Sequence, residues 1–173
     1  MRVTWNSFVS PMGALTLVEC ASGPLVVEYA ASSRGSNWAE RLRQGRPGIN
    51  IEVGPCPQLE RWLEAYFRGR PRPFAYPAHL ADFFRADLAS ETVWRLLCTI
   101  PLGETRSYED IARSSGQHPR RAGQIISANP LSICIPCHRV VGKHGDLVGY
   151  GGGLKRKRWL LDHELRTCGL VLS

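Results

Sequence analysis

Cys137 and His138 lie next to each other in the run Ile-Pro-Cys-His-Arg-Val at residues 135–140. Only a thiolate attacks, so a cysteine with the ordinary pKa of about 8.5 needs activation by a base. Because adjacent side chains usually diverge, we expect His138 to reach Cys137 through a water rather than directly. A carboxylate would then orient the imidazole, and the sequence leaves four candidates open: Glu60, Glu104, Glu109 and Glu164.

Cys134 forms a C-x-x-C pair with Cys137, a pattern that also occurs in zinc ribbons and thiol–disulfide enzymes. A zinc ribbon needs a second such pair, and the sequence has none, so we expect no metal. A thioredoxin-like site needs the pair early in a βαβ unit, which the surrounding sequence does not resemble. The other cysteines are irregularly spaced and read as small apolar residues whose disulfide state is open: Cys20, Cys56, Cys98 and Cys168.

The chain has 173 residues, of which 43% are hydrophobic, as is typical of a globular protein of one or two small domains. Its net charge of +7 favours polyanionic partners, nucleic acid first. The sequence has no apolar run long enough to span a membrane, and residues 1–9 lack the features of a signal peptide. We therefore expect a cytoplasmic protein without a membrane partner, whose charge favours association with nucleic acid.

The first half of the sequence is rich in short β-type runs. Residues 3–9, 15–20 and 25–30 carry β-branched and aromatic side chains between Gly- and Pro-containing turns, which predicts an antiparallel meander. Residues 45–57 are rich in Gly and Pro and are expected to form a loop. A helix is predicted over residues 58–68, where apolar side chains recur at three- and four-residue spacing. The proline-rich residues 70–77 indicate a linker, so we expect two domains, at 1–77 and 78–173.

The second half is predicted to be mainly helical. One helix is expected over residues 92–100, and Ser107 can cap the next one together with Asp110. A further helix over residues 120–128 would end at Asn129, because the proline that follows pushes this residue out of the α region. Two short helices joined by a tight Gly-containing turn have the outline of a helix-turn-helix.

The last predicted helix, over residues 155–165, begins with consecutive cations at 155–158. Cations at a helix N-terminus oppose the helix dipole, which favours an anionic partner nearby. Lys157 and Glu164 lie seven residues apart and therefore share one face of this helix. That face can present both side chains to one pocket.

A longer pattern around Cys137 resembles one protein family. Its parts are Asn129-Pro130, Pro-Cys-His-Arg-Val-Val-Gly at 136–142, Gly149-Tyr150-Gly151-Gly152-Gly153, Lys157, Trp159-Leu160-Leu161, His163-Glu164, and, upstream, Gly-Glu-Thr-Arg-Ser-Tyr at 103–108 and Ser-Pro-Met-Gly at 10–13. With this pattern the sequence resembles the O6-alkylguanine-DNA alkyltransferases, also called methylated-DNA–protein-cysteine methyltransferases. The resemblance is close in the C-terminal half and holds in outline in the N-terminal half.

The resemblance implies an α+β fold. Its N-terminal domain would be a small ribonuclease H-like β-sheet with a helix, and its C-terminal domain would be mainly α with a helix-turn-helix. It also implies irreversible transfer of an alkyl group from O6-alkylguanine, mainly O6-methylguanine, to Cys137, once per molecule and without a cofactor. His138 would take the thiol proton through a water, Glu164 would polarise His138, and Asn129 would brace the turn.

Further roles follow from the same resemblance for the residues around the departing base. Tyr108 would donate to ring N3, Lys157 would supply a stabilising charge, and the N–H of Gly151 would donate to O6. Tyr150 and Ile126 would line the substrate pocket. The carbonyls of Cys137 and Val140 would accept hydrogen bonds from the exocyclic amine. Many relatives have serine at the position of Gly151, but a backbone donor survives that change.

The implied partner is double-stranded DNA containing O6-alkylguanine, bound by a monomer, with cooperative assembly on DNA left open. A base inside a duplex is out of reach, so its nucleotide must be flipped out. The family places the second helix of the helix-turn-helix in the minor groove, where Arg120 would fill the vacated stack, and Arg121, Gly123 and Ala128 would lie near DNA. The stretch from Tyr108 to Arg120 is shorter than in the family, which shortens the turn.

Three other functions compete with DNA alkyl transfer. Alkyltransferase-like proteins share the scaffold but replace the nucleophilic cysteine, whereas Cys137 is present here. A Cys–His hydrolase normally has its histidine far away in the sequence. A thiol–disulfide enzyme that used Cys134 would have no role for Asn129, Tyr150 or Glu164.

Overall fold

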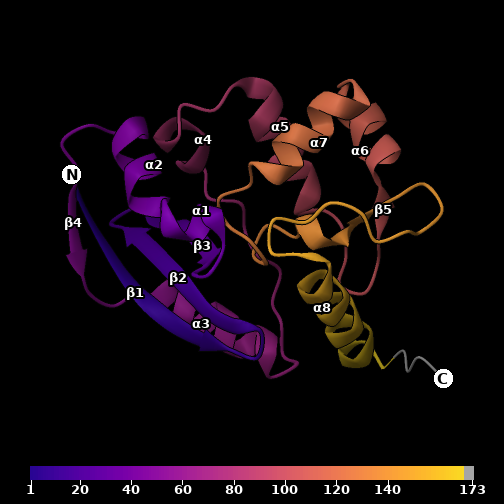
Figure 1. The fold of residues 1–173 in the computed structure, drawn as a ribbon, viewed down its shortest axis with the longest axis horizontal. Helices are drawn as coiled ribbons and strands as arrows, with labels where there is room; N and C mark the ends of the chain where they lie inside the picture. The colour runs from indigo at the N-terminus through magenta and orange to yellow at the C-terminus, as the bar shows by residue number, and fades with distance from the viewer. Residues whose placement is uncertain (170–173) are drawn as a thin grey trace. The chain divides into compact units, whose positions relative to one another are not determined.

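The computed structural model describes residues 1–169, which form two compact units (Figure 1). The first unit consists of Met1–Asp87 together with Pro130–Cys134, and the second of Leu88–Asn129 and the chain from Ile135 onward. The fold is α+β, as predicted, with a small sheet in the first unit and mainly helices in the second. Within the described residues, no helix is both long and apolar enough to cross a membrane.

The sheet of the first unit has the strand order β3-β2-β1-β4. The antiparallel meander is confirmed by β1 (Arg2–Ser10), β2 (Gly13–Cys20) and β3 (Gly23–Tyr29). The prediction of a loop over residues 45–57 is wrong in part, because β4 (Asn50–Val53) pairs in parallel with β1. The half-buried Ile51 packs against the core from this strand. A strand of this length becomes one only through long-range pairing, which a local pattern does not reveal.

Four helices belong to the first unit: α1 (Ser33–Ser36), α2 (Trp38–Gly45), α3 (Pro57–Phe67) and α4 (Leu80–Phe83). Helix α3 confirms the helix predicted over residues 58–68. Leu42 of α2 and Phe83 of α4 join Val18 and Leu25 of the sheet in one buried apolar cluster. Because Phe83 belongs to this core, the compact unit extends to Asp87, beyond the boundary expected after Pro77.

The segment Pro130–Cys134 is held by the sheet unit although its flanking residues belong to the helical unit. Val27 N of β3 donates to Pro130 O at 2.9 Å, and Ser132 N donates back to Val27 O at 2.9 Å. The Ser132 hydroxyl also donates to the buried carboxylate of Glu28 at 3.4 Å. Ile133 has a φ of +72°, which a β-branched residue rarely adopts. These contacts anchor the residues that come immediately before the turn containing Cys137.

The second unit contains α5 (Leu88–Leu97), α6 (Tyr108–Ser115), α7 (Pro119–Ser127), the 3-10 turn η1 (Cys137–Arg139), α8 (Leu154–Thr167), and a short parallel pair, β5 (Arg106–Ser107) and β6 (Val140–Val141). Helices α7 and α8 confirm the helices predicted over residues 120–128 and 155–165. Helix α5 begins and ends earlier than the predicted 92–100. The pairing of β5 with β6 brings the start of α6 beside the end of η1.

Helices α6 and α7 pack together and are joined by a tight turn. The predicted capping box is present, because the Ser107 hydroxyl accepts from Asp110 N at 3.0 Å while Asp110 Oδ2 accepts from Ser107 N at 3.1 Å. Gly116 ends α6 in the left-handed conformation with a φ of +66°. His118 then caps α7, and Pro119 occupies its first turn, where the missing N–H costs nothing. The sequence therefore determines this turn locally at both of its ends.

Replacing Ser107 with alanine removes the side-chain half of the capping box. We expect Ser107→Ala to lower the free energy of unfolding by about 1 kcal/mol, since a helix N-terminal N–H loses its acceptor. Urea unfolding followed by circular dichroism measures the change. Ser114→Ala, on the exposed side of the same helix, is the control and should leave the midpoint nearly unchanged. Equal losses in the two variants would contradict the capping role.

Candidate active site

Cys137 is the first residue of η1 and is buried, with 7% of its surface exposed. Asn129, at the end of α7, donates through Nδ2 to Cys137 Sγ at 3.2 Å and to Ile135 O at 2.9 Å. The amide therefore holds the two sides of the turn together and supplies a donor to the sulfur. A hydrogen bond to sulfur stabilises the thiolate relative to the thiol.

His138 is fully buried and is oriented by one carboxylate. Its Nε2 lies 2.6 Å from Glu164 Oε1, whereas its Nδ1 is buried and has no hydrogen-bond partner among the described residues. Burial lowers the pKa of His138 more than Glu164 raises it, so the imidazole is neutral at neutral pH. With Nε2–H donating to the carboxylate, Nδ1 is left as an acceptor. A neutral imidazole with an available Nδ1 lone pair can act as a base.

Of the four carboxylates that the sequence left open, Glu164 is the one that contacts His138. Glu60 belongs to the first unit and accepts from Asn6. The other two form ion pairs with surface cations, Glu104 with Arg106 at 3.1 Å and Glu109 with Lys143 at 3.5 Å. The pattern of charges along the sequence could not make this choice, because these pairings depend on the folded chain.

Glu164 is fully buried on the inner face of α8 and also contacts Arg139, which the sequence analysis did not single out. Burial raises the pKa of the Glu164 carboxyl, but the hydrogen bonds from His138 and Arg139, with the charge of Arg139, outweigh this and hold the pKa below its usual range. Since His138 is neutral, the guanidinium supplies the lasting positive charge. In the sequence, Arg139 could have been noticed from its position directly after Cys137 and His138.

Lys157 shares the buried face of α8 with Glu164, as the seven-residue spacing predicted. Its Nζ donates to Val140 O at 2.5 Å, Val148 O at 2.6 Å and Gly149 O at 3.2 Å. Burial lowers the pKa of Lys157 to about 8, although Cys137 opposes this shift. The three contacts match the three donor hydrogens of an ammonium group. Lys157 therefore ties the loop after β6 to the strand itself.

Tyr108 begins α6 and contacts the same loop. Its hydroxyl donates to Gly149 O at 3.0 Å, and Lys157 Nζ lies 5.7 Å from the centre of its ring. Burial, with a contribution from Cys137, raises the pKa of Tyr108, so the hydroxyl remains a donor. Gly149 has a φ of +49°, and a Cβ there would lie 3.0 Å from the tyrosine oxygen. The close approach of Tyr108 to this loop thus requires glycine.

The remaining expected residues fall into two groups. Val140 and Ile126 are buried, Tyr150 is half-buried, and Gly151 is exposed with open space around it. The positions expected at DNA lie on the outer side of α7, where Arg120, Arg121 and Ala128 are exposed and Gly123 is half-buried. A Cβ on Gly123 would lie 4.0 Å from Tyr108 Cδ1, so this side of α7 adjoins Tyr108.

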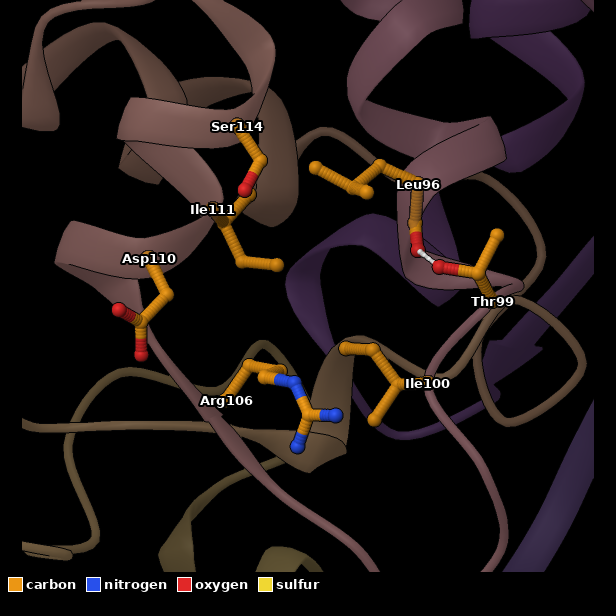
Figure 2. Close-up of a pocket in the computed structure, with 7 residues that line it drawn as sticks. All are labelled: Leu96, Thr99, Ile100, Arg106, Asp110, Ile111 and Ser114. Carbon is orange, nitrogen blue, oxygen red and sulfur yellow. Dashed lines mark hydrogen bonds between the residues drawn. The ribbon is translucent and has the colours of Figure 1, made fainter.

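A small cavity of about 80 Å³ lies between the end of α5 and α6, but it is not part of this site. Figure 2 shows its lining, which includes Ile100, Arg106 and Ile111 and neither Cys137 nor His138. The described residues contain no group of three or more His, Cys, Asp or Glu side chains arranged to hold a metal ion. All six cysteines lie within the described residues, and no disulfide joins any of them.

Comparison with known proteins identifies the class of the helical unit first. Residues 89–166 match the family model described as "6-O-methylguanine DNA methyltransferase, DNA binding domain". Two solved structures share the whole fold with a TM-score of 0.77. They are Mycobacterium tuberculosis O6-methylguanine methyltransferase, at 34% identity over 95% of this chain and 94% of that one, and M. tuberculosis OGT in complex with DNA, at 33% identity over 96% and 94%.

Full-length relatives identify the family. The chain is 45% identical over 169 residues to the inducible methylated-DNA–protein-cysteine methyltransferase of Bacillus subtilis, covering 94% of this chain and 86% of the relative. It is 36% identical over 168 residues to the corresponding human protein, covering 92% and 79%. The chain therefore belongs to the methylated-DNA–protein-cysteine methyltransferases, which confirms the resemblance and the enzyme class expected from the sequence.

The buried, neutral His138 predicts a pH dependence of stability. Its pKa is lowered in the folded state, so the unfolded chain binds a proton near the ordinary pKa of about 6.5 whereas the folded chain does not. The free energy of unfolding should therefore fall as pH drops below 6.5, with a slope approaching about 1.4 kcal/mol per pH unit. Urea unfolding between pH 5 and 7 measures it. His138→Gln should lose this dependence of stability on pH. The control His163→Gln, in the same unit, should keep it. An unchanged slope in His138→Gln would contradict a neutral buried imidazole.

Proposed function

We propose that the chain repairs DNA by moving an alkyl group from guanine O6 to Cys137, in a reaction that each molecule performs once. The observation that carries this proposal is the set of contacts around one sulfur. Asn129 donates to Cys137 Sγ, and the adjacent His138 is neutral, buried and aligned by Glu164. This arrangement supports a thiolate nucleophile with a base nearby, and family membership supports DNA alkyl transfer as its use.

The reaction begins with proton transfer from Cys137 to His138 Nδ1 through a water. The thiolate then attacks the alkyl carbon from the side opposite to O6. A carbon–sulfur bond forms as the carbon–oxygen bond breaks, and the electron pair of that bond remains on the guanine. The product on the protein is a thioether, whose carbon–sulfur bond does not hydrolyse under physiological conditions. The protein is therefore consumed one molecule per alkylated guanine.

The departing guanine carries negative charge that the surrounding donors can stabilise. Gly151 offers a backbone N–H in open space, and Tyr108 offers a hydroxyl that remains protonated. In the structure this hydroxyl donates to Gly149 O, so donation to the base requires Tyr108 to exchange or share its partner. Lys157 acts through its charge and by holding the loop that carries Tyr150 and Gly151.

DNA binds to the outer side of α7 in this proposal. Cys137 is only 7% exposed, so a base that remains stacked in a duplex cannot present its O6 substituent to Sγ. The nucleotide must rotate out of the helix, and a protein side chain then takes its place in the stack. Arg120 is exposed in the first turn of α7, on the side that adjoins Tyr108. It is the side chain we assign to the vacated position in a complex with one protein molecule.

Mass spectrometry tests the transfer directly. After incubation with duplex DNA containing O6-methylguanine, we expect one methyl group per protein molecule, located on Cys137 by peptide analysis. Cys137→Ala should gain none, and Cys134→Ala is the matched control that should still be methylated. Repeated turnover, or methylation of Cys134 instead, would contradict the proposal. DNA binding without any transfer would instead indicate a non-reactive DNA-binding protein on this scaffold.

The role of Arg120 is separable from the chemistry. Arg120→Ala should slow methyl transfer from duplex DNA by about tenfold, equal to about 1.4 kcal/mol, because the flipped state loses its stacking partner. Transfer from free O6-benzylguanine, which needs no flipping, should change little. Arg166→Ala, which removes an exposed cation at the end of α8, controls for net charge. Equal losses on both substrates would contradict a role in flipping.

A further inference from the structure

Arg139 makes a two-point contact with the carboxylate that orients His138. Its Nε donates to Glu164 Oε2 at 2.9 Å, and its Nη2 donates to Glu164 Oε1 at 3.0 Å. Its Nη1 donates to Ile100 O at 2.6 Å, beyond the end of α5. Arg139 is 9% exposed and Glu164 is fully buried, so water contributes little to this contact. The guanidinium plane is therefore held from both sides, by a carboxylate and by a backbone carbonyl.

Glu164 needs this partner in order to remain ionised. Among the described residues, His138 Nε2 at 2.6 Å and Gly103 N at 3.4 Å also donate to its carboxylate. Neither carries a charge while the imidazole is neutral. An ionised carboxylate without a nearby positive charge is unstable at a fully buried position and would take up a proton. A guanidinium is suited to prevent this, because it stays protonated in proteins and matches both carboxylate oxygens.

We infer that Arg139 is a positioning residue for the reaction, because it keeps Glu164 an acceptor and thereby leaves the His138 Nδ1 lone pair available to accept the thiol proton. This inference rests on the proposed function. If Glu164 were protonated it would donate to Nε2, and the imidazole proton would move to Nδ1. If His138 were protonated instead, both ring nitrogens would be donors. In either case the base would be lost.

The other titratable and charged groups around this cluster do not replace Arg139. Lys157, from the same face of α8, contacts three backbone carbonyls rather than Glu164. Cys98, near the end of α5, faces Arg139, and burial raises its pKa to about 11, so it remains neutral. Cys137 accepts from Asn129, and Tyr108 donates to Gly149 O. Arg139 is the cation that donates to both carboxylate oxygens of Glu164.

The pH dependence of alkyl transfer tests this inference. The rate constant for benzyl transfer from free O6-benzylguanine is measured by intact mass between pH 5 and 9. In wild type we expect the rate to persist below pH 6.5. In Arg139→Met, the acidic limb of the profile should move up by about one pH unit or more, and the rate on that limb should fall about tenfold for each unit of the shift. Arg139→Lys keeps the charge but not the two-point contact, so its limb should move in the same direction by less.

Arg95→Met is the matched control, since Arg95 is an exposed arginine paired with Glu91 on α5. It should leave the profile of wild type unchanged. A rate that falls by the same factor at every pH in both Arg139 variants would overturn the inference, because that result describes a loss of folded protein only. If Arg139→Met does not fold, the pH profile of Arg139→Lys tests the inference instead. An acidic limb that stays at the wild-type pH in Arg139→Lys would contradict a positioning role for Arg139.

A second measurement does not depend on alkyl transfer. Nitrogen-15 NMR of labelled histidine reports which ring nitrogen carries the proton. Wild type at pH 7 should show His138 with an unprotonated Nδ1, and Arg139→Met should show a protonated one. If Cys137 accepts no alkyl group from any substrate, the proposed function fails, while these spectra still decide whether Arg139 sets the protonation of His138. Identical His138 spectra in wild type and Arg139→Met would refute the inference.

Discussion

The buried carboxylate of Glu164 constrains how α8 packs on η1 in the helical unit. A charge that has lost water must be surrounded by donors, and here they come from separate stretches of the chain, His138 and Arg139 of η1 and the backbone of Gly103. The position of α8 relative to η1 is therefore determined by hydrogen-bond geometry as well as by apolar packing. Two turns earlier on the same face, Lys157 repeats the principle with opposite charge, because its ammonium is satisfied by carbonyls. One helix thus fixes the turn that holds the sulfur and the loop that follows it.

A second constraint acts on the chain before Cys137. The main chain leaves the helical unit after Asn129, pairs with β3 of the sheet unit through residues 130–134, and returns at Ile135. Ile133 adopts a left-handed conformation on the way, which costs on the order of 1–3 kcal/mol and persists only where surrounding contacts enforce it. Asn129, which precedes the segment 130–134, donates hydrogen bonds to Ile135 O and Cys137 Sγ, which follow it. Asn129 thus fixes the turn that carries the sulfur both at Ile135 and at Cys137 itself.

Local signals in the sequence predicted much of the fold and less of the site. The meander, the helix at 58–68 and the capping box of Ser107 follow from side-chain periodicity and turn residues, and these features are present. Strand β4 was missed because its pairing with β1 spans a long stretch of chain. At the site, the spacing of Lys157 and Glu164 correctly placed both on one face, but four carboxylates remained possible partners for His138 until the fold selected one. The contact of Arg139 with Glu164 was not apparent for the same reason, since residues 25 apart meet only once α8 packs on η1.

In the proposed reaction, the loop at residues 148–151 is where these constraints would meet the substrate. Lys157 and Tyr108, the two side chains that the resemblance assigns to the charge of the departing guanine, both donate to this loop. A base that enters beside Gly151 therefore competes with the protein's own carbonyls for the tyrosine hydroxyl. The competition is nearly balanced in hydrogen bonds, since one acceptor replaces another, and so the outcome depends on charge. A guanine that gains negative charge as its alkyl group departs is a stronger acceptor than a neutral carbonyl. The exchange of Tyr108 from Gly149 to the base would then favour the transition state over the bound substrate, which is what catalysis requires of a donor.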